Sequence, residues 1–435
     1  MDVNTVLHSD DDAVRRLLLK GNFGLEKESL RLTPSGNMAH TLHPFPDNKH
    51  IVRDFCENQT EINTPVADSP ERAIEFLTQY TEEIQAKLVS LPEPEILWPF
   101  SNPAYIHNEE DIPVAQFTGG YSSKTDYREY LSNRYGRYKM VLSGIHVNFS
   151  FADELLQADF KAGRHSDFQE YKNSLYLSLA RQAAAYGWII TAVTAASPLM
   201  DSSYVEKNRM GYTTFNGMAS TRCSELGYWN YFTPVLNYKT IQAYADSIWR
   251  YVHDGLLAAP TELYYPIRLK PRGLNRLETL ANEGVDHIEL RMVDLNPFEP
   301  SGLNLMDLKF AHLLLVWLAS TSSCDLSVKD QVQAVQNFKN AAHYDLKTVK
   351  IVPPTGRVCS VADAGLEVIA QMKAFYHDFP SDIQEVLRFE ETKFIDPETR
   401  YAWRIRKQFS YQFVEQGLYL AKQLQKSLLQ NEYYV

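Results

Sequence analysis

Four short stretches of the chain alternate apolar residues with residues that bind metals or anions. Side chains on a β-strand point to opposite faces in turn, so residues two apart share a face and lie about 7 Å from each other. The polar members are Glu26 and Glu28, then Asp54 and Glu61, then His146, Asn148 and Ser150, and finally His287, Glu289 and Arg291. A solvated sheet face explains any one such stretch, whereas four of them favour a common site.

The carboxylates of these stretches indicate a site for divalent cations. Like charges gathered on one sheet face repel each other unless they are protonated or bridged by cations. Oxygen ligands of this kind suit Mg²⁺ or Mn²⁺, and the predicted metal ligands are Glu26, Glu28, Asp54, Glu61, Glu289 and His146. Arg291 shares the face of Glu289 and adds a planar, two-pronged cation for carboxylate or phosphate. Metal and arginine together indicate phosphoryl chemistry.

The remaining patterns predict the elements that hold this face in place. Strands are expected over 23–30, 54–62, 143–150 and 287–292, and helices over 10–20, 70–88, 124–140, 167–197 and 302–321, with an amphipathic helix or helix pair over 400–431. Ser69 and Pro70 form a capping signal for the second helix, which should pack on the apolar back of the sheet. Gly21 is expected to end the first helix. Half-polar strands separated by long helices predict an α+β fold on an antiparallel sheet.

Length and charge limit the class of protein. The 435 residues are 44% hydrophobic, which is enough for a large core. The net charge of −11 argues against binding the phosphate backbone of nucleic acid as the main activity. We treat the chain as one domain over 1–435, with a motif-bearing part at about 20–320 and a helical part at about 321–435.

Cysteine usage and the missing motifs narrow the choice further. Cys56, Cys223, Cys324 and Cys359 are too scattered for a disulfide framework or a structural zinc site, which favours the cytoplasm. The N-terminus lacks the features of a secretory signal, and the most apolar run, 183–196, is too short to span a membrane. The chain contains no P-loop and no dinucleotide-binding glycine motif. An ATP site would therefore depend on carboxylate-bound metal.

Several ordered segments of the chain resemble the bacterial glutamate–cysteine ligase family over roughly residues 20–320. They lie at 24–31, 54–66, 98–99, 127–136, 143–150, 222–228 and 288–298. Agreement on so many ordered motifs is far more specific than any one of them. The second segment is also similar to the N-terminal ligase half of bifunctional glutathione synthases. The resemblance implies an antiparallel sheet curled into a funnel, as in the catalytic domain of glutamine synthetase.

The resemblance implies an ADP-forming carbon–nitrogen ligase. ATP would phosphorylate the γ-carboxylate of L-glutamate, and the amine of L-cysteine would displace phosphate to give γ-glutamylcysteine, the first step of glutathione biosynthesis. Mg²⁺ or Mn²⁺ would neutralise the triphosphate, the main requirement of phosphoryl transfer. The expected partners are these small molecules, without nucleic acid or membrane. Functional coupling to a separate glutathione synthase, in place of a fused second half, is one option.

The same resemblance assigns roles to individual residues. Arg222 and Arg291 would face the glutamyl phosphate as catalytic cations, and Asn148 and Lys270 would contact the nucleotide. Arg128 would bind a substrate carboxylate, and the cysteine pocket would consist of Phe55, Tyr127, Leu131, Tyr228 and Tyr264. The alternatives are an ordinary surface lysine for Lys270, a structural histidine for His146 and core positions for the aromatic residues.

Two departures from the family pattern concern the acceptor. Met140 stands where other members have a polar pocket residue, and Asn102 precedes Pro103 where others differ. An apolar pocket separates a thiol from a methyl group by only ~1–3 kcal/mol, so a ligase of the same fold with another amine acceptor or another carboxylate donor is the first alternative. A regulator that binds nucleotide or amino acid without turnover is the second, and the six retained metal ligands argue against it.

Overall fold

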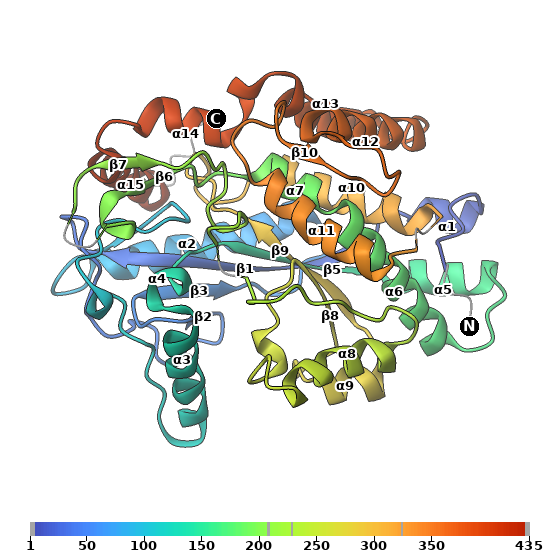
Figure 1. Ribbon diagram of the computed structural model, residues 1–435, viewed down its shortest axis with the longest axis horizontal. Coiled ribbons are helices and arrows are strands. Elements are labelled where there is room, and N and C mark those ends of the chain that lie inside the picture. Colours follow the sequence, from blue (N-terminus) through green and yellow to red (C-terminus); the bar gives the residue numbers. More distant parts are fainter. Residues whose placement is uncertain (1–4, 207–208, 228, 323–324, 431–435) are drawn as a thin grey trace.

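The computed structural model describes residues 5–206, 209–227, 229–322 and 325–430, and an antiparallel sheet forms its centre (Figure 1). The strand order is β2-β3-β1-β5-β9-β8, and β4 pairs with the far end of β1. These strands are β1 (Gly21–Leu32), β2 (Ile51–Arg53), β3 (Gln59–Asn63), β4 (Ile96–Leu97), β5 (Ile145–Phe151), β8 (Ile267–Lys270) and β9 (His287–Val293). The predicted α+β class with an antiparallel sheet is confirmed, whereas the curl into a funnel stays a prediction.

Helices and two short hairpins surround this sheet. The hairpins pair β6 (Leu199–Asp201) with β7 (Thr213–Phe215) and β10 (Lys350–Ile351) with β11 (Cys359–Ser360). The helices are α1 (Asp12–Leu17), α2 (Pro70–Val89), α3 (Ser122–Tyr135), α4 (Arg137–Met140), α5 (Asp153–Ala162), α6 (Phe168–Tyr186), α7 (Trp188–Thr194), α8 (Ile241–His253), α9 (Leu277–Glu283), α10 (Leu305–Ser320), α11 (Val328–Ala341), α12 (Val361–Phe375), α13 (Ser381–Ile395), α14 (Tyr401–Phe409) and α15 (Phe413–Leu429).

One face of the sheet is apolar and packs against helices. Phe23, Val147 and Leu290 are at most 2% exposed and belong to the largest hydrophobic core, which also takes in α2, α6, α7 and α10. The predicted packing of α2 on the sheet is confirmed by its contacts with β1 and β3. Figure 1 shows α12 and α13 as an outer layer beyond α10. Burial of this face is the main stabilising contribution and leaves the other face of each strand for the site.

The C-terminal helices close a second core with residues from the first third of the chain. The region predicted as a helix or helix pair forms the pair α14 and α15. Phe413 of α15 packs its ring 5.7 Å from Trp98 and 5.0 Å from Phe100, and Gly417 lies against the Trp98 ring with no room for a side chain. This interlocking supports the proposal that the chain folds as one unit.

Three glycines mark where the helices differ from the predicted ranges. The first helix ends at Leu17, and Gly21 begins β1 instead, where a side chain would collide with the Phe149 ring. Gly136, at a φ of 82°, separates α3 from α4. Gly187 stands between α6 and α7, at a position where a Cβ would lie 2.5 Å from the carbonyl oxygen of Ala183.

The prediction of one strand over 54–62 is wrong, because this segment turns and forms a hairpin. β2 ends at Arg53, the chain turns through 54–58, and β3 returns from Gln59. Backbone bonds from Gln59 N–H to the Cys56 oxygen and from Asp54 N–H to the Gln59 oxygen close the turn. The Asn58 side chain anchors it by donating to the carbonyl oxygens of Ala39 and Asp111, at 2.9 Å each. An Asn so placed favours a turn over a continuous strand.

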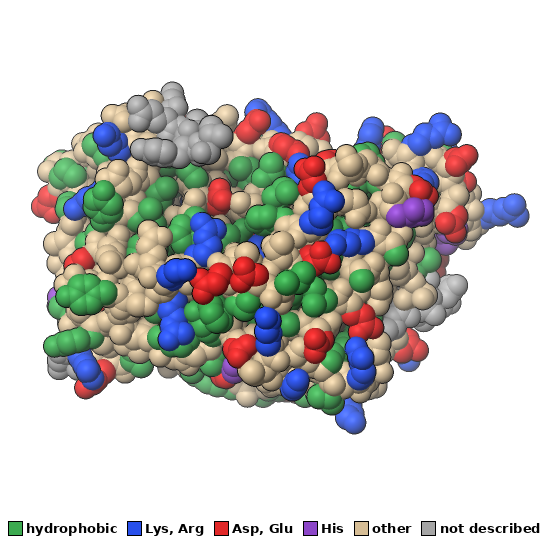
Figure 2. Space-filling view, turned by 90° about the horizontal axis from the view of Figure 1, so that it is seen from above, with side chains coloured by type: hydrophobic (Ala, Val, Ile, Leu, Met, Phe, Trp, Pro, Cys, Tyr) green, Lys and Arg blue, Asp and Glu red, His purple; other side chains and the backbone are tan. Residues whose placement is uncertain are grey.

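The surface fits the charge argument drawn from composition. On the face shown in Figure 2, Lys and Arg side chains are interspersed with Asp and Glu, and the described part of that face carries no continuous basic patch. Within the described ranges, no helix combines the length and the apolarity needed to cross a membrane.

Candidate active site

Strand register brings together acidic residues that are far apart in the sequence. Glu26 on β1 stands opposite His146 on β5, and Glu28 stands opposite Glu61 on β3. Glu289 on β9 stands opposite Asn148 on β5. The polar faces of all four predicted stretches therefore meet on one side of the sheet. The β5–β9 ladder shifts register between Ile145 and Val147, next to His146, and such irregularities often lie beside active sites.

Glu26, His146 and Glu289 form the tightest cluster. His146 Nδ1 lies 3.0 Å from Glu26 Oε2 and 3.8 Å from Glu289 Oε1. One potential ligand atom from each of the three lies within 4.8 Å of the other two. Asn148 Nδ2 donates to Glu26 Oε1 at 3.0 Å and holds that carboxylate in the cluster. Sequence reasoning thus found three residues that the fold does place together.

Glu28, Glu61 and Asp54 form the second acidic group, beside the first. Burial and the charge of Asp54 raise the pKa of Glu28 to about 8. Burial and the charges of Asp54, Glu26 and Glu28 raise the pKa of Glu61 well above its ordinary value. Like charges placed opposite each other on neighbouring strands destabilise a sheet. The raised pKa values of Glu28 and Glu61 agree with the expected repulsion, which adds to the larger effect of burial.

Glu26 and Glu289 differ, because cations or hydrogen bonds hold their charge. Burial alone would raise the pKa of Glu289, but Arg291 and Lys270 outweigh it and hold that pKa well below its ordinary value. Arg291 donates to Glu289 Oε1 at 3.0 Å, and Lys270 Nζ lies 3.3 Å from the same oxygen. The pKa of Glu26 is also lowered, because its hydrogen bond with His146 and neighbouring cations outweigh burial. Glu289 itself raises the pKa of Glu26, so the two carboxylates do repel each other, but the hydrogen bond from His146 and the neighbouring cations outweigh this repulsion.

Arg222 and Arg291 both reach the cluster, while their predicted role toward a glutamyl phosphate stays a prediction. Arg222 donates to His146 Nε2 at 2.9 Å and to the carbonyl oxygen of Arg291 at 2.6 Å. Because Nε2 accepts this hydrogen bond, His146 is the neutral tautomer with its proton on Nδ1, facing Glu26. Burial and the charge of Arg291 lower the pKa of His146 to about 4, which agrees with a neutral ring.

The donor set fits a divalent cation. Glu289 Oε2 and Asn148 Oδ1 are buried and accept no hydrogen bond from the described residues. Buried oxygens without donors are costly, and a bound cation would satisfy them. Carboxylate oxygens are ligands that Mg²⁺ and Mn²⁺ accept, and the His146 ring would join them by giving up its hydrogen bond with Glu26 or with Arg222.

Two glycines fix the path of Arg222, and sequence reasoning missed their role. A Cβ on Gly144 would lie 2.4 Å from Arg222 Cζ, so the guanidinium lies across the backbone at this position. A Cβ on Gly227 would lie 1.8 Å from the carbonyl oxygen of Arg222. Both glycines belong to segments quoted for the family resemblance. The sequence signal for both glycines is that they lie close in the chain to predicted site residues, Gly144 to His146 and Gly227 to Arg222.

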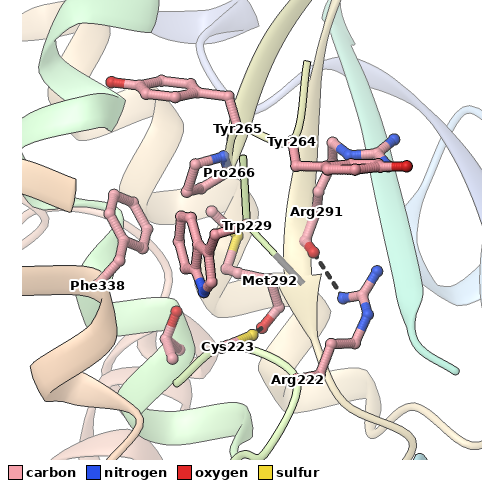
Figure 3. Close-up of a pocket in the computed structure, with 10 residues that line it drawn as sticks. Arg222, Cys223, Trp229, Tyr264, Tyr265, Pro266, Arg291, Met292 and Phe338 are labelled. Carbon is pink, nitrogen blue, oxygen red and sulfur yellow. Dashed lines mark hydrogen bonds between the residues drawn. The ribbon is translucent and has the colours of Figure 1, made fainter. Parts of the chain in front are cut away.

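An apolar chamber opens beside the two arginines (Figure 3). Arg222, Arg291 and Tyr264 line one side of it, while Trp229, Pro266 and Phe338 line the other. The figure shows Arg222 pointing to the backbone oxygen of Arg291 at the edge of this chamber. A small molecule with a carboxylate would meet two cations on one side of the chamber and apolar side chains on the other.

A larger cavity of about 550 Å³ lies beside Glu26 and Asn148. Lys172 and Arg272 line it, and both approach Asp286, at 3.9 and 3.1 Å. These cations were not predicted, because Lys172 is one lysine on α6 and nothing in its local pattern sets it apart. The volume is in the range of pockets that hold small ligands and cofactors.

Comparison with known proteins identifies the family. A family model described as glutamate-cysteine ligase matches residues 7–233 and 231–341. The glutathione biosynthesis bifunctional protein of Listeria innocua serovar 6a is 34% identical over 431 residues, which cover 95% of this chain and 55% of that protein. The chain belongs to the glutamate–cysteine ligase family. The homologous protein of Clostridium perfringens is also 34% identical, and the match covers 48% of its length. The chain therefore spans about half the length of the curated relatives it matches.

Solved structures agree with the glutamate–cysteine ligase family at the level of the fold. The bifunctional glutathione synthetase of Pasteurella multocida superposes with a TM-score of 0.82 at 27% identity, covering 97% of this chain and 54% of that one. The glutamate–cysteine ligase of Francisella tularensis, solved in complex with AMP, superposes with a TM-score of 0.83 at 23% identity, covering 94% and 89%.

Four of the residues predicted for the cysteine pocket of a glutamate–cysteine ligase belong to or pack against one hydrophobic cluster. Phe55, Leu131 and Tyr264 belong to one hydrophobic cluster, and Tyr127 packs against it. Tyr228 lies outside the described residues. Met140 is in the same cluster, and Tyr264 Oη lies 3.9 Å from Met140 Sδ. The position of Met140 supports its assignment to the pocket wall.

Asn102, the other departure from the glutamate–cysteine ligase pattern, has a structural role. It is 1% exposed, and its Nδ2 donates to the carbonyl oxygens of Ser197 and Leu199 and to Thr221 Oγ1. These bonds tie the 101–103 segment to the turn that carries Arg222. Asn102 therefore acts on the site through the backbone.

We expect no cysteine of this glutamate–cysteine ligase family member to act as a nucleophile. Cys56, Cys223 and Cys359 are free and buried, and Cys324 lies outside the described residues. Burial and the charge of Asp294 raise the pKa of Cys223 to about 12, so the reactive thiolate is scarce. A Cys56→Ala, Cys359→Ala double variant should keep wild-type turnover, and Cys223→Ser should turn over at saturating substrate. A glutamyl thioester on the protein, found by mass spectrometry, would contradict this prediction.

Proposed function

We propose that the protein is an ADP-forming glutamate–cysteine ligase. The observation that carries the proposal is the meeting of the acid cluster with Arg222 and Arg291 between the large cavity and the apolar chamber. Membership of the family supports the same reaction. L-glutamate would be phosphorylated on its γ-carboxylate by ATP, and the amine of L-cysteine would then attack the acyl carbon and release phosphate.

The described residues fit the separate tasks of this reaction. Glu26, Glu28, Asp54, Glu61, His146 and Glu289 would hold Mg²⁺ or Mn²⁺, which would neutralise the charge on the triphosphate and on the acyl phosphate. Arg222 and Arg291 would bind the phosphoryl oxygens as charge passes to the leaving group. Asn148, at the edge of the large cavity, would contact the nucleotide together with Lys172 and Arg272. Lys270 would act through Glu289, the carboxylate it pairs with.

The acceptor would enter from the aromatic side of the site. Phe55, Tyr127, Leu131 and Tyr264 would surround the cysteine side chain, and Arg128 would bind its carboxylate. Because Met140 makes this wall apolar, an acceptor with a methyl group in place of the thiol, such as L-2-aminobutyrate, is a second candidate substrate. The reaction would take place in the cytoplasm, with the second step of glutathione biosynthesis carried out by another catalytic unit.

ADP release tests this proposal directly. The protein is assayed with ATP, L-glutamate and Mg²⁺ while the amine acceptor is varied. Release that depends on both glutamate and L-cysteine, with γ-glutamylcysteine identified by mass spectrometry, is the expected result. Turnover with another amine alone would point to a different ligase, and binding of nucleotide without turnover would point to a regulator.

Arg291→Lys tests the phosphate contact. Lysine keeps the charge but loses the two-pronged geometry that lets Arg291 hold Glu289 and a phosphoryl oxygen together, so kcat should fall by about tenfold or more. Steady-state ADP release at saturating substrates measures it. Arg209→Lys, which alters a solvent-exposed arginine paired with Glu206 at 2.8 Å, is the matched control. Unchanged kinetics in Arg291→Lys would reduce this residue to a structural ion pair.

A further inference from the structure

Phe117 is surrounded by three cations at the outer edge of the predicted acceptor pocket. Arg53 Cζ lies 4.5 Å from the centre of its ring, Arg128 Cζ lies 4.8 Å from it, and Lys124 Nζ lies 5.5 Å from it. An aromatic face attracts cations at such distances through its quadrupole. The sequence motifs assign no role to Phe117, and the reaction described above does not use it.

The backbone around Phe117 is fixed to both neighbouring elements. Its N–H donates to Thr125 Oγ1 of α3 at 2.7 Å. Two residues earlier, the N–H of Ala115 donates to the carbonyl oxygen of Phe55 at 3.1 Å. The ring is therefore held between the turn that carries Asp54 and Phe55 and the helix that carries Tyr127 and Arg128.

Arg128 is oriented without the help of a carboxylate. Its Nε donates to the carbonyl oxygen of Asp54, and one terminal nitrogen donates to the carbonyl oxygen of Lys124 at 3.1 Å. Its other terminal nitrogen has no hydrogen-bond acceptor among the described residues, and no described carboxylate pairs with it. Its bond to the backbone of Asp54 places the guanidinium beside the turn that carries one of the predicted acids.

We propose that Phe117 positions Arg128 for the carboxylate of the amine acceptor and so makes the enzyme prefer acceptors that carry one. An acidic partner would neutralise Arg128 and compete with the substrate. An aromatic face instead holds the guanidinium plane and leaves the second terminal nitrogen of Arg128 available to a carboxylate. The inference rests on the proposed function, because it assumes that Arg128 faces the acceptor.

Two acceptors separate this role from a merely structural one. L-cysteine and cysteamine share the amine and the thiol, but cysteamine lacks the carboxylate. Phe117→Leu keeps an apolar side chain and removes the aromatic face, so the KM for L-cysteine should rise about five- to tenfold while kcat changes little. The kinetics with cysteamine should stay as in the wild type. Phe117→Tyr keeps the face and should restore the wild-type KM.

Controls and contrary outcomes complete the experiment. Lys124→Ala removes the exposed cation from the same ring and should leave both acceptors unaffected, and melting temperatures check that each variant folds. Equal losses with L-cysteine and cysteamine, or no loss with either, would overturn the role of Phe117. Wild-type protein that uses neither acceptor, measured first, would overturn the proposed function and this inference with it. Wild-type turnover with L-cysteine but an unaltered Phe117→Leu variant would overturn the inference alone.

Discussion

Replacing Gly144 by Ala should lower kcat by about 100-fold or more, the range found when a preorganised transition-state donor is lost. The new Cβ would stand 2.4 Å from Arg222 Cζ and 2.6 Å from its Nε, so the guanidinium must leave its place beside His146. Its hydrogen bonds to His146 Nε2 and to the carbonyl oxygen of Arg291 would then be lost. ADP release under saturating substrates measures the effect.

The fold should survive this substitution, because movement of the Arg222 side chain relieves the clash and the backbone can stay in place. Gly144 does not have a positive φ, so alanine is compatible with its conformation. Gly120→Ala is the matched control, since nothing lies within 4 Å of a Cβ there. A Gly144→Ala protein with normal melting temperature and normal turnover would show that Arg222 need not lie across this position.

Glu28→Gln should stabilise the metal-free protein while reducing turnover by about tenfold or more. Glutamine keeps the shape of the side chain and an oxygen to accept the N–H of Gly144, now at 2.9 Å from Glu28 Oε2. It removes the charge that burial and Asp54 make unfavourable. The melting temperature in EDTA should therefore rise by several degrees at pH 8.

The pH dependence of this gain has a definite sign. In the unfolded chain Glu28 ionises near the ordinary value of 4.5, whereas its folded pKa is about 8. As the pH rises from 4.5 to about 8, ionisation of Glu28 therefore favours the unfolded chain more and more. Over this pH range the wild type loses stability relative to Glu28→Gln. The difference in melting temperature should vanish below pH 4.5, grow up to about pH 8 and then stay constant. Glu385→Gln, on the exposed surface, should show no such trend.

The sheet and half of the site could be predicted from local pattern. Alternation placed Glu26, Glu28, His146 and Glu289 on the polar faces of three strands, because the side-chain period of a strand is two wherever the strand lies. The family resemblance added Arg222, which has no such pattern around it. The family model matching 7–341 confirms that resemblance.

What local pattern could not predict depends on contacts between distant segments. Lys172 meets Asp286 only because α6 packs beside β8 and β9, and no signal near either residue announces it. Burial acts on both Glu28 and Glu289, but their pKa values shift in opposite directions, because Asp54 adds to the effect of burial at Glu28 whereas Arg291 and Lys270 outweigh it at Glu289. The turn at 54–58 has no glycine or proline to mark it, and Asn58 bonds to residues far along the chain.

The central position of β1 has a consequence for how the protein opens. This strand is 12 residues long and hydrogen-bonds to β3, β4 and β5, so its amides lie in the interior of the sheet. Amides of this kind exchange with deuterated solvent only when the whole structure unfolds. Glu26 and Glu28 thus stand on the slowest-exchanging backbone of the molecule, and the movement that admits and releases substrates must fall to the surrounding segments.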